Sequence, residues 1–251
     1  MKTLLFSGLF LLVLAVSPLM AEVTGKTFVN GYGANFQPFA FTEKGQATGF
    51  DIEAINWIAN KLGFTVQHLA LEWDNVIQRL IDKKVDLVAS GLSITPERAG
   101  QIAFTKPYWN VKQHVLASKD ATFTAQEALT SGYKIGVLKG TSEAKAMETS
   151  NGVDGRRYEL ESYVSNELAA NDLINGRIKA LIFNDPSTND ILKNPAIKVI
   201  GDAGFPPEQF SYGVHKDNKE LLEALNQGLE LLKADPYWQI LIDKYKPGGT
   251  K

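Results

Sequence analysis

Apolar and polar positions follow one another along the chain in blocks, each a short apolar run, then a polar turn, then an amphipathic segment. Short apolar runs bounded by turn residues are typical of buried strands, and apolar residues spaced by three and four are typical of helices. Strands that alternate with helices in this way predict α/β layers. The expected strands span 27–32, 64–69, 85–89, 133–138 and 180–183, and the expected helices span 50–62, 73–81, 95–102, 142–148, 167–175, 221–233 and 236–245.

Two extended segments, 111–118 and 210–215, interrupt this alternation and mark where the chain would cross between two α/β units. A weak internal repeat, LIDKKV at 80–85 and LINGRI at 173–178, indicates that the two units are related. No low-complexity segment separates the halves. We therefore expect two lobes in one chain that crosses twice: 22–110 with 210–251 as the first lobe, and 111–209, which includes the crossovers, as the second.

Residues 1–21 have the pattern of a cleaved secretory signal peptide. Lys2 supplies a positive charge, residues 4–16 are apolar or small, and Ala21 is a small residue before the polar start at Glu22. The alternative is a membrane anchor, but a spanning helix needs ~20 apolar residues. This predicts export to the periplasm, with the mature chain beginning near Glu22.

Composition narrows the classes of function. The chain has no cysteine, which excludes disulfides, thiol catalysis and a lipid-attachment cysteine. Its 26 basic and 28 acidic side chains form no charged block, so nucleic acid is a poor partner. The three histidines fit no metal-binding spacing, and neither a catalytic serine elbow nor a nucleotide-binding glycine pattern is found. We expect a protein without metal, cofactor or catalytic residues.

The clearest candidate site follows the expected strand 85–89. Open α/β sheets bind ligands beyond the carboxyl ends of their strands. Thr95 is suited to begin a helix there, which puts Arg98 in the first turn, where the helix dipole disfavours a cation. A ligand carboxylate would stabilise Arg98 through two parallel hydrogen bonds, and the hydroxyls of Ser90 and Ser93 could add more. The alternative is an exposed Arg98 beside Glu97.

The expected second lobe carries two further strand ends. Thr141 and Ser142 begin a helix after a glycine turn, where free backbone N–H groups suit an anion, although both residues can also simply cap the helix. Asp185 follows the strand 180–183, and its carboxylate would complement an ammonium group. The alternative for Asp185 is a turn formed by an Asp-Pro pair.

Two aromatic residues, Phe36 and Trp73, lie after expected strands and could form either a ligand-stacking surface or part of the core.

Taken together, these segments resemble the family 3 periplasmic solute-binding proteins, which include the glutamine-, histidine- and lysine/arginine/ornithine-binding proteins. The resemblance covers nearly the whole mature chain. It implies a type II periplasmic binding protein fold, two lobes joined by crossover strands that close on a free amino acid, and delivery to the membrane permease of an ABC importer. The motifs that carry it are GFDI at 49–52, LSITPER at 92–98, AFT at 103–105, GVL at 136–138 with GT at 140–141, and PYW at 236–238.

The resemblance also implies a role for each candidate. Arg98 would bind the ligand α-carboxylate with help from Ser93, Thr141 and Ser142. The α-ammonium would go to Asp185, with Ser90 as a further acceptor, and the ligand side chain would lie between Phe36 and Trp73.

One position departs from the family members that bind cationic amino acids: Gly33 stands where they carry an acid. This favours a neutral ligand side chain, polar or aromatic, although Glu72 and Asp74 lie nearby in sequence. We expect a monomer. The alternatives are a dehydratase of cyclohexadienyl acids on the same fold, and a ligand-sensing module for a membrane receptor.

Overall fold

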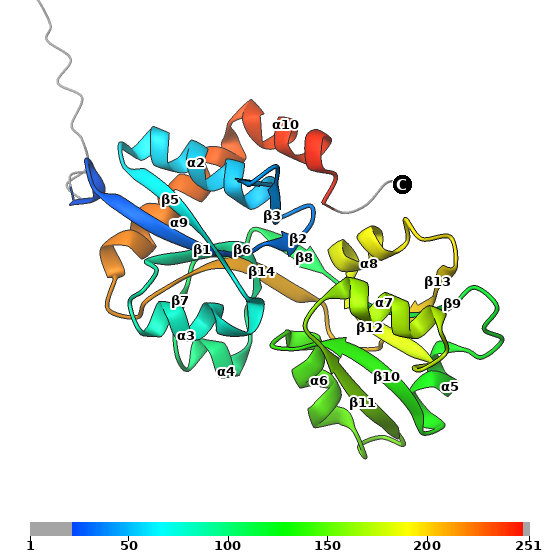
Figure 1. The fold of residues 1–251 in the computed structure, drawn as a ribbon. Helices are drawn as coiled ribbons and strands as arrows, with labels where there is room; N and C mark the ends of the chain where they lie inside the picture. The colour runs from blue at the N-terminus through cyan, green and yellow to red at the C-terminus, as the bar shows by residue number, and fades with distance from the viewer. Residues whose placement is uncertain (1–21, 248–251) are drawn as a thin grey trace, which may run out of the picture.

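The computed structural model describes residues 22–247, so the expected signal peptide lies outside the described residues. The chain forms two α/β lobes side by side (Figure 1), which confirms the expected two-lobe fold class. Within residues 22–247 no helix combines the length and apolar character needed to cross a membrane.

The first lobe is built on a sheet with strand order β5-β1-β6-β14-β7, to which β8 adds by pairing with β14. Helices α2, α9 and α10 cover one face of this sheet, and α3 and α4 cover the other (Figure 1). Its strands are β1 (Thr27–Gly33), β5 (Thr65–Leu71), β6 (Leu87–Ser93), β7 (Ala103–Phe104), β8 (Trp109–Val111) and β14 (Glu208–Val214), with a small separate sheet of β2 (Asn35–Phe36), β3 (Ala40–Glu43) and β4 (Gln46–Thr48). Its helices are α2 (Phe50–Leu62), the 3₁₀ turn Trp73–Asn75, α3 (Val76–Ile81), α4 (Pro96–Ala99), α9 (Lys219–Ala234) and α10 (Pro236–Tyr245).

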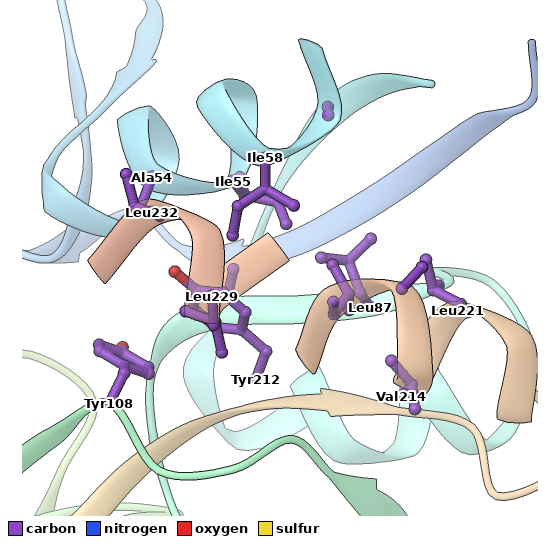
Figure 2. Packing of buried hydrophobic residues seen from close by; sticks show 14 of the residues in the cluster. Ala54, Ile55, Ile58, Leu87, Tyr108, Tyr212, Val214, Leu221, Leu229 and Leu232 are labelled. Atoms are coloured by element: carbon purple, nitrogen blue, oxygen red, sulfur yellow. The ribbon is translucent and has the colours of Figure 1, made fainter. Parts of the chain in front are cut away.

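The core of the first lobe lies where α2 and α9 pack on the sheet. Ile55 and Ile58 of α2 are fully buried, and so is Leu232 of α9. Figure 2 shows these side chains gathered between the two helices and the sheet. Removing this much apolar surface from water is the dominant favourable contribution to folding. The strands of this lobe are therefore held in place by a well-packed core.

The second lobe has the strand order β11-β10-β12-β9-β13. Helices α5 and α6 pack into one apolar cluster of this lobe, and α7 and α8 into another. Its strands are β9 (Gln113–Ser118), β10 (Tyr133–Leu138), β11 (Tyr158–Tyr163), β12 (Ala180–Asn184) and β13 (Ile197–Asp202), and its helices are α5 (Ala125–Thr130), α6 (Ser142–Ser150), α7 (Asn166–Ile174) and α8 (Asp185–Ile191).

The crossing points differ from those expected. The chain leaves the first sheet after β8 and enters the second at β9, so it crosses at Lys112, and it returns through residues 203–207. All but the last residue of the expected crossover 210–215 lies instead in β14, which pairs antiparallel with β6 inside the first sheet. The residue pattern alone does not distinguish a strand within a sheet from a connection between sheets, because both segments have an extended backbone.

The parallel pairing of strands determines where the candidate ligand-binding residues lie. Strand β1 runs parallel to β5 and β6 in the first lobe, and β10 runs parallel to β11 and β12 in the second. Their carboxyl ends therefore lie at a shared edge of each sheet. Residues at the ends of β1, β6, β10 and β12 line a single cavity between the lobes.

Candidate ligand-binding site

A cavity between the lobes brings together most of the strand ends that the sequence singled out. About 90 Å³ of it is open to the centres of water molecules. One water needs only ~10–15 Å³ by that measure, so the cavity has room for a small solute. It is lined by Gly33, Ala34, Asn35, Phe36, Leu71, Glu72, Trp73, Gly91 and Ser93 from the first lobe, and by Leu138, Thr141, Ser142, Glu143, Val164, Ser165, Asn166, Phe183, Asn184 and Ser187 from the second.

Arg98 lies beside this cavity and bridges the two lobes. Thr95 caps α4 by accepting a hydrogen bond from the Arg98 N–H at 3.2 Å, as the sequence predicts. The guanidinium donates to the carbonyl oxygens of Ser93 and Gly140, each at 2.9 Å, and lies 6.0 Å from the centre of the Trp73 ring. Arg98 is 9 % exposed, so it is not the solvent-exposed arginine of the alternative reading.

Charges around Arg98 partly compensate for its burial. Burial lowers the pKa of the Arg98 guanidinium, while the negative charges of Glu143, Glu208 and Glu97 act in the opposite direction. Within residues 22–247 none of these carboxylates is close enough to Arg98 to form an ion pair. The buried cation is therefore hydrogen-bonded only to neutral carbonyl groups.

Phe36 and Trp73 both line the cavity, but as neighbouring parts of one wall. Their ring centres are 6.3 Å apart with an angle of 30° between the ring planes, a separation at which aromatic rings contact each other directly. A planar side chain does not fit between rings at this distance. The structure thus provides an aromatic surface for a ligand rather than the expected slot between two rings.

The shape of this wall depends on Gly91. Its φ is +58°, and a Cβ there would lie 2.3 Å from Cε1 of Phe36. The Gly91 N–H donates at 2.6 Å to the buried carboxylate of Asp51, which also accepts from the Tyr108 hydroxyl at 2.7 Å. Burial raises the pKa of Asp51 to about 7 despite these hydrogen bonds. Asp51 thereby fixes the backbone conformation that lets Phe36 approach.

Ser90 and Ser93 occupy different positions although they share β6. Ser93 lines the cavity. Ser90 is fully buried, and its hydroxyl oxygen accepts from the Gly33 N–H at 3.1 Å, which joins β6 to β1. Ser90 is not among the residues that line the cavity.

Thr141 and Ser142 begin α6 at the cavity. The Thr141 hydroxyl oxygen accepts from the Ala144 N–H at 3.1 Å and the hydroxyl donates to the Leu138 carbonyl at 2.7 Å, so Thr141 is the helix cap. The Ser142 hydroxyl oxygen lies 2.6 Å from a carboxylate oxygen of Glu208 on β14. Both side chains line the cavity, which is compatible with capping and ligand contact at once.

Asp185 does not face the cavity in this structure. It starts α8, and its carboxylate accepts from the Lys112 N–H at 2.9 Å and lies 2.5 Å from Nε2 of His114 on β9. Partial burial acts to raise the pKa of Asp185, but the hydrogen bonds from His114 and Lys112 outweigh it and hold the pKa below its usual value. Asp185 thus ties β9, next to the crossing point, to α8.

Three residues that line the cavity, Glu143, Asn184 and Ser187, were not predicted from the sequence. Asn184 caps α8 by accepting from the Ser187 N–H at 3.2 Å, and both residues line the cavity. Glu143 also lines it and is 3 % exposed. An acid in the first turn of a helix is ordinary, so the local sequence carried no signal that Glu143 would be buried.

Among the described residues, no group of three or more histidine, aspartate and glutamate side chains is arranged to hold a metal ion.

Residues 28–248 match the sequence profile of the bacterial extracellular solute-binding proteins, family 3. The ABC transporter arginine-binding protein 1 of Escherichia coli is 32% identical to this chain over 223 residues, which is 86% of this chain and 89% of the relative. The probable histidine-binding protein of Campylobacter jejuni is 29% identical over 251 residues, 96% of this chain and 95% of the relative.

Solved structures of similar proteins have the same fold. An ancestral amino acid-binding protein described as a precursor of cyclohexadienyl dehydratase matches with a TM-score of 0.78 and 28% identity, and the match covers 90% of this chain and 96% of that one.

Proposed function

The chain belongs to family 3 of the bacterial extracellular solute-binding proteins, and from this premise we propose that it captures a free amino acid between its lobes and delivers it to the permease of an ABC importer. The relatives that support this are an ABC transporter arginine-binding protein, a probable histidine-binding protein and a lysine/arginine/ornithine-binding periplasmic protein. A signal peptide at 1–21 would bring this chain to the same compartment.

One observation carries the proposal: the buried cation of Arg98 lies at the junction of both lobes, and no carboxylate among residues 22–247 forms an ion pair with it. A guanidinium binds a carboxylate through charge-assisted hydrogen bonds that are roughly twice as strong as neutral ones. The carbonyls of Ser93 and Gly140 satisfy only part of its five-donor capacity. An α-carboxylate entering beside Ser93 would supply the missing negative charge.

We propose a ligand with a neutral side chain, polar or aromatic. The wall formed by Phe36, Trp73, Leu138 and Phe183 supports this, because it offers apolar surface to a side chain. Gly33 supports it too, since a Cβ there would lie 3.2 Å from the Trp73 ring, so the tight packing leaves little room for an acidic side chain at this position.

A cationic side chain is the second candidate, and Glu72 favours it. Glu72 lines the same cavity and is exposed to solvent. The relative from Escherichia coli is named for arginine. Glu72 could therefore pair with a distal positive charge on the ligand.

We also propose that the protein is a carrier and not a catalyst, and that it acts as a monomer. Its family members are binding proteins. The neighbour described as a precursor of cyclohexadienyl dehydratase is itself an amino acid-binding protein, so likeness to that lineage does not favour catalysis.

A thermal-shift screen of refolded, ligand-free protein tests the proposal. A compound that binds the native state raises the melting temperature by mass action. We expect one or a few of the twenty amino acids to do so, and the neutral or cationic nature of the hits to decide between the two side-chain classes. A response only to prephenate or arogenate, with consumption of that compound, would show the dehydratase instead.

A further inference from the structure

Glu143 is a buried acid that the fold alone does not explain. It lies in the first turn of α6, lines the cavity and is 3 % exposed. One carboxylate oxygen accepts from the Asn184 N–H at 3.1 Å, and the other lies 3.2 Å from the Ser142 hydroxyl. An ionised carboxylate has about four sites that can accept hydrogen bonds, so part of its capacity remains open toward the cavity.

Glu143 forms no ion pair with any cationic side chain in the described part of the chain. Within residues 22–247 no lysine, arginine or histidine nitrogen lies within 4.0 Å of its carboxylate. Lys145, two residues further along α6, pairs with Glu97 and Glu148 instead. Burying an ionised carboxylate without a cation is unfavourable. Burial first, and repulsion from Glu208 second, raise the pKa of Glu143 to about 7.

Arg98 and Glu143 carry opposite charges close to the same cavity. Arg98 donates to the carbonyl of Gly140, three residues before Glu143, so both charges gather around the start of α6. Their attraction contributes to the pKa values of both groups, yet they are too far apart to form an ion pair. A zwitterion placed between them would supply a carboxylate for Arg98 and an ammonium for Glu143.

The other acids near the cavity are less suited to this role. Asp185 points to the crossing point, where His114 and the Lys112 N–H already occupy its oxygens. Asn184, which takes its place at the cavity, is neutral. Glu72 is exposed to solvent, which screens its charge.

We propose that Glu143, and not Asp185, binds the α-ammonium of the ligand opposite Arg98, and that the site therefore selects zwitterionic α-amino acids over carboxylic acids that lack the amine. This rests on the proposed function and assigns a residue to it. A charge-assisted hydrogen bond in a buried site accounts for a discrimination of about 10- to 100-fold.

Calorimetric titration of Glu143→Gln tests the assignment. Each amino acid that binds the wild type is compared with the acid that lacks its amine: 3-phenylpropanoate for phenylalanine, 4-carbamoylbutanoate for glutamine, 5-guanidinopentanoate for arginine. We expect Glu143→Gln to weaken amino-acid binding about 10- to 100-fold and to change binding of the amine-free acid by less than about 3-fold. Glu148→Gln, the same change at an exposed site on α6, is the matched control and should leave both affinities unaltered.

A variant of the alternative residue Asp185, and a measurement of the protons released on binding, complete the test. Asp185→Asn should change amino-acid affinity less than Glu143→Gln does. If Glu143→Gln does not fold, the wild type alone can test the assignment. At a pH of about 6.5, binding of an amino acid should release protons because Glu143 ionises. Binding of the amine-free acid should release none. Glu208 and Arg98 are the charged groups that face Glu143, and Glu208→Gln shows whether the protons come from Glu208.

Unchanged amino-acid affinity in folded Glu143→Gln, or a larger loss in Asp185→Asn, would overturn the assignment while leaving the carrier function intact. A wild type that binds none of the twenty amino acids would overturn the proposed function itself.

Discussion

The guanidinium of Arg98 in the first lobe donates a hydrogen bond to the carbonyl oxygen of Gly140 in the second lobe at 2.9 Å. This contact joins the helix start after β6 to the turn after β10. Gly140 has a φ of +76°, and a Cβ there would lie 2.9 Å from Cα of Asp74, so the lobes meet here backbone to backbone. The two lobes are therefore in direct contact beside the cavity.

Replacing Gly91 by alanine should destabilise the first lobe and displace Phe36. The left-handed φ disfavours any side chain, and the new methyl group would overlap Phe36. We expect a loss of about 2–4 kcal/mol in the free energy of unfolding, measured by urea denaturation, together with weaker amino-acid binding. Gly45→Ala is the matched control, because its φ is +78° but no atom lies within 4 Å of the new methyl. Equal losses in the two variants would refute the steric account of Gly91.

Stability should depend on pH through Asp51. Its pKa is about 7 in the folded protein against an ordinary 3.8, so the folded state holds a proton that the unfolded state releases. The contribution is complete below a pH of about 4 and is lost as the pH rises to about 7. Asp51→Asn should remove the share of this slope that comes from Asp51, a few kcal/mol, and leave the share of Glu143, whose pKa is raised over the same range. Urea unfolding of both proteins across this range measures the difference. A wild type and a variant with parallel pH profiles would contradict it.

The ion pair between Lys139 and Asp74 should favour the closed lobes slightly. The two side chains are 2.9 Å apart across the cleft, with Lys139 60% exposed. Exposed pairs contribute about 0.2–1 kcal/mol, so Asp74→Asn should weaken ligand affinity by at most about 5-fold, and less at high salt. Calorimetric titration at two salt concentrations measures this. The exposed pair Lys83–Asp217 lies within the first lobe, so Asp217→Asn should leave affinity unchanged; an equal loss there would show that the effect is not one of closure.

Long periodic elements could be predicted from the sequence almost residue by residue. The helices Phe50–Leu62 and Pro236–Tyr245 and the strand Tyr133–Leu138 have the bounds that the apolar pattern gave. In each case local signals agree with the tertiary environment. The strands Tyr158–Tyr163 and Ile197–Asp202 were not predicted, because each has only a short alternation, YEL or IKV, and not the continuous apolar run that marks the buried strands.

The position of the cavity could be predicted from the sequence, but the directions of the side chains around it could not. The positions near the ends of expected strands predicted roles for Phe36, Trp73, Ser93, Thr141 and Ser142. All five line one cavity in the structure. The direction of Asp185 depends on His114, 71 residues away, and the burial of Glu143 depends on Asn184, 41 residues away. No local pattern carries such information.

The most direct test of the account is calorimetric titration of amino acids into ligand-free wild type and Arg98→Ala, with circular dichroism to show that both are folded. We predict that the wild type binds at least one amino acid with one-to-one stoichiometry and a dissociation constant of about 1 µM or lower, corresponding to about 8 kcal/mol. Arg98→Ala should show no detectable binding, because loss of a charge-assisted pair removes the α-carboxylate partner. Equal affinity in the two folded proteins would contradict the account.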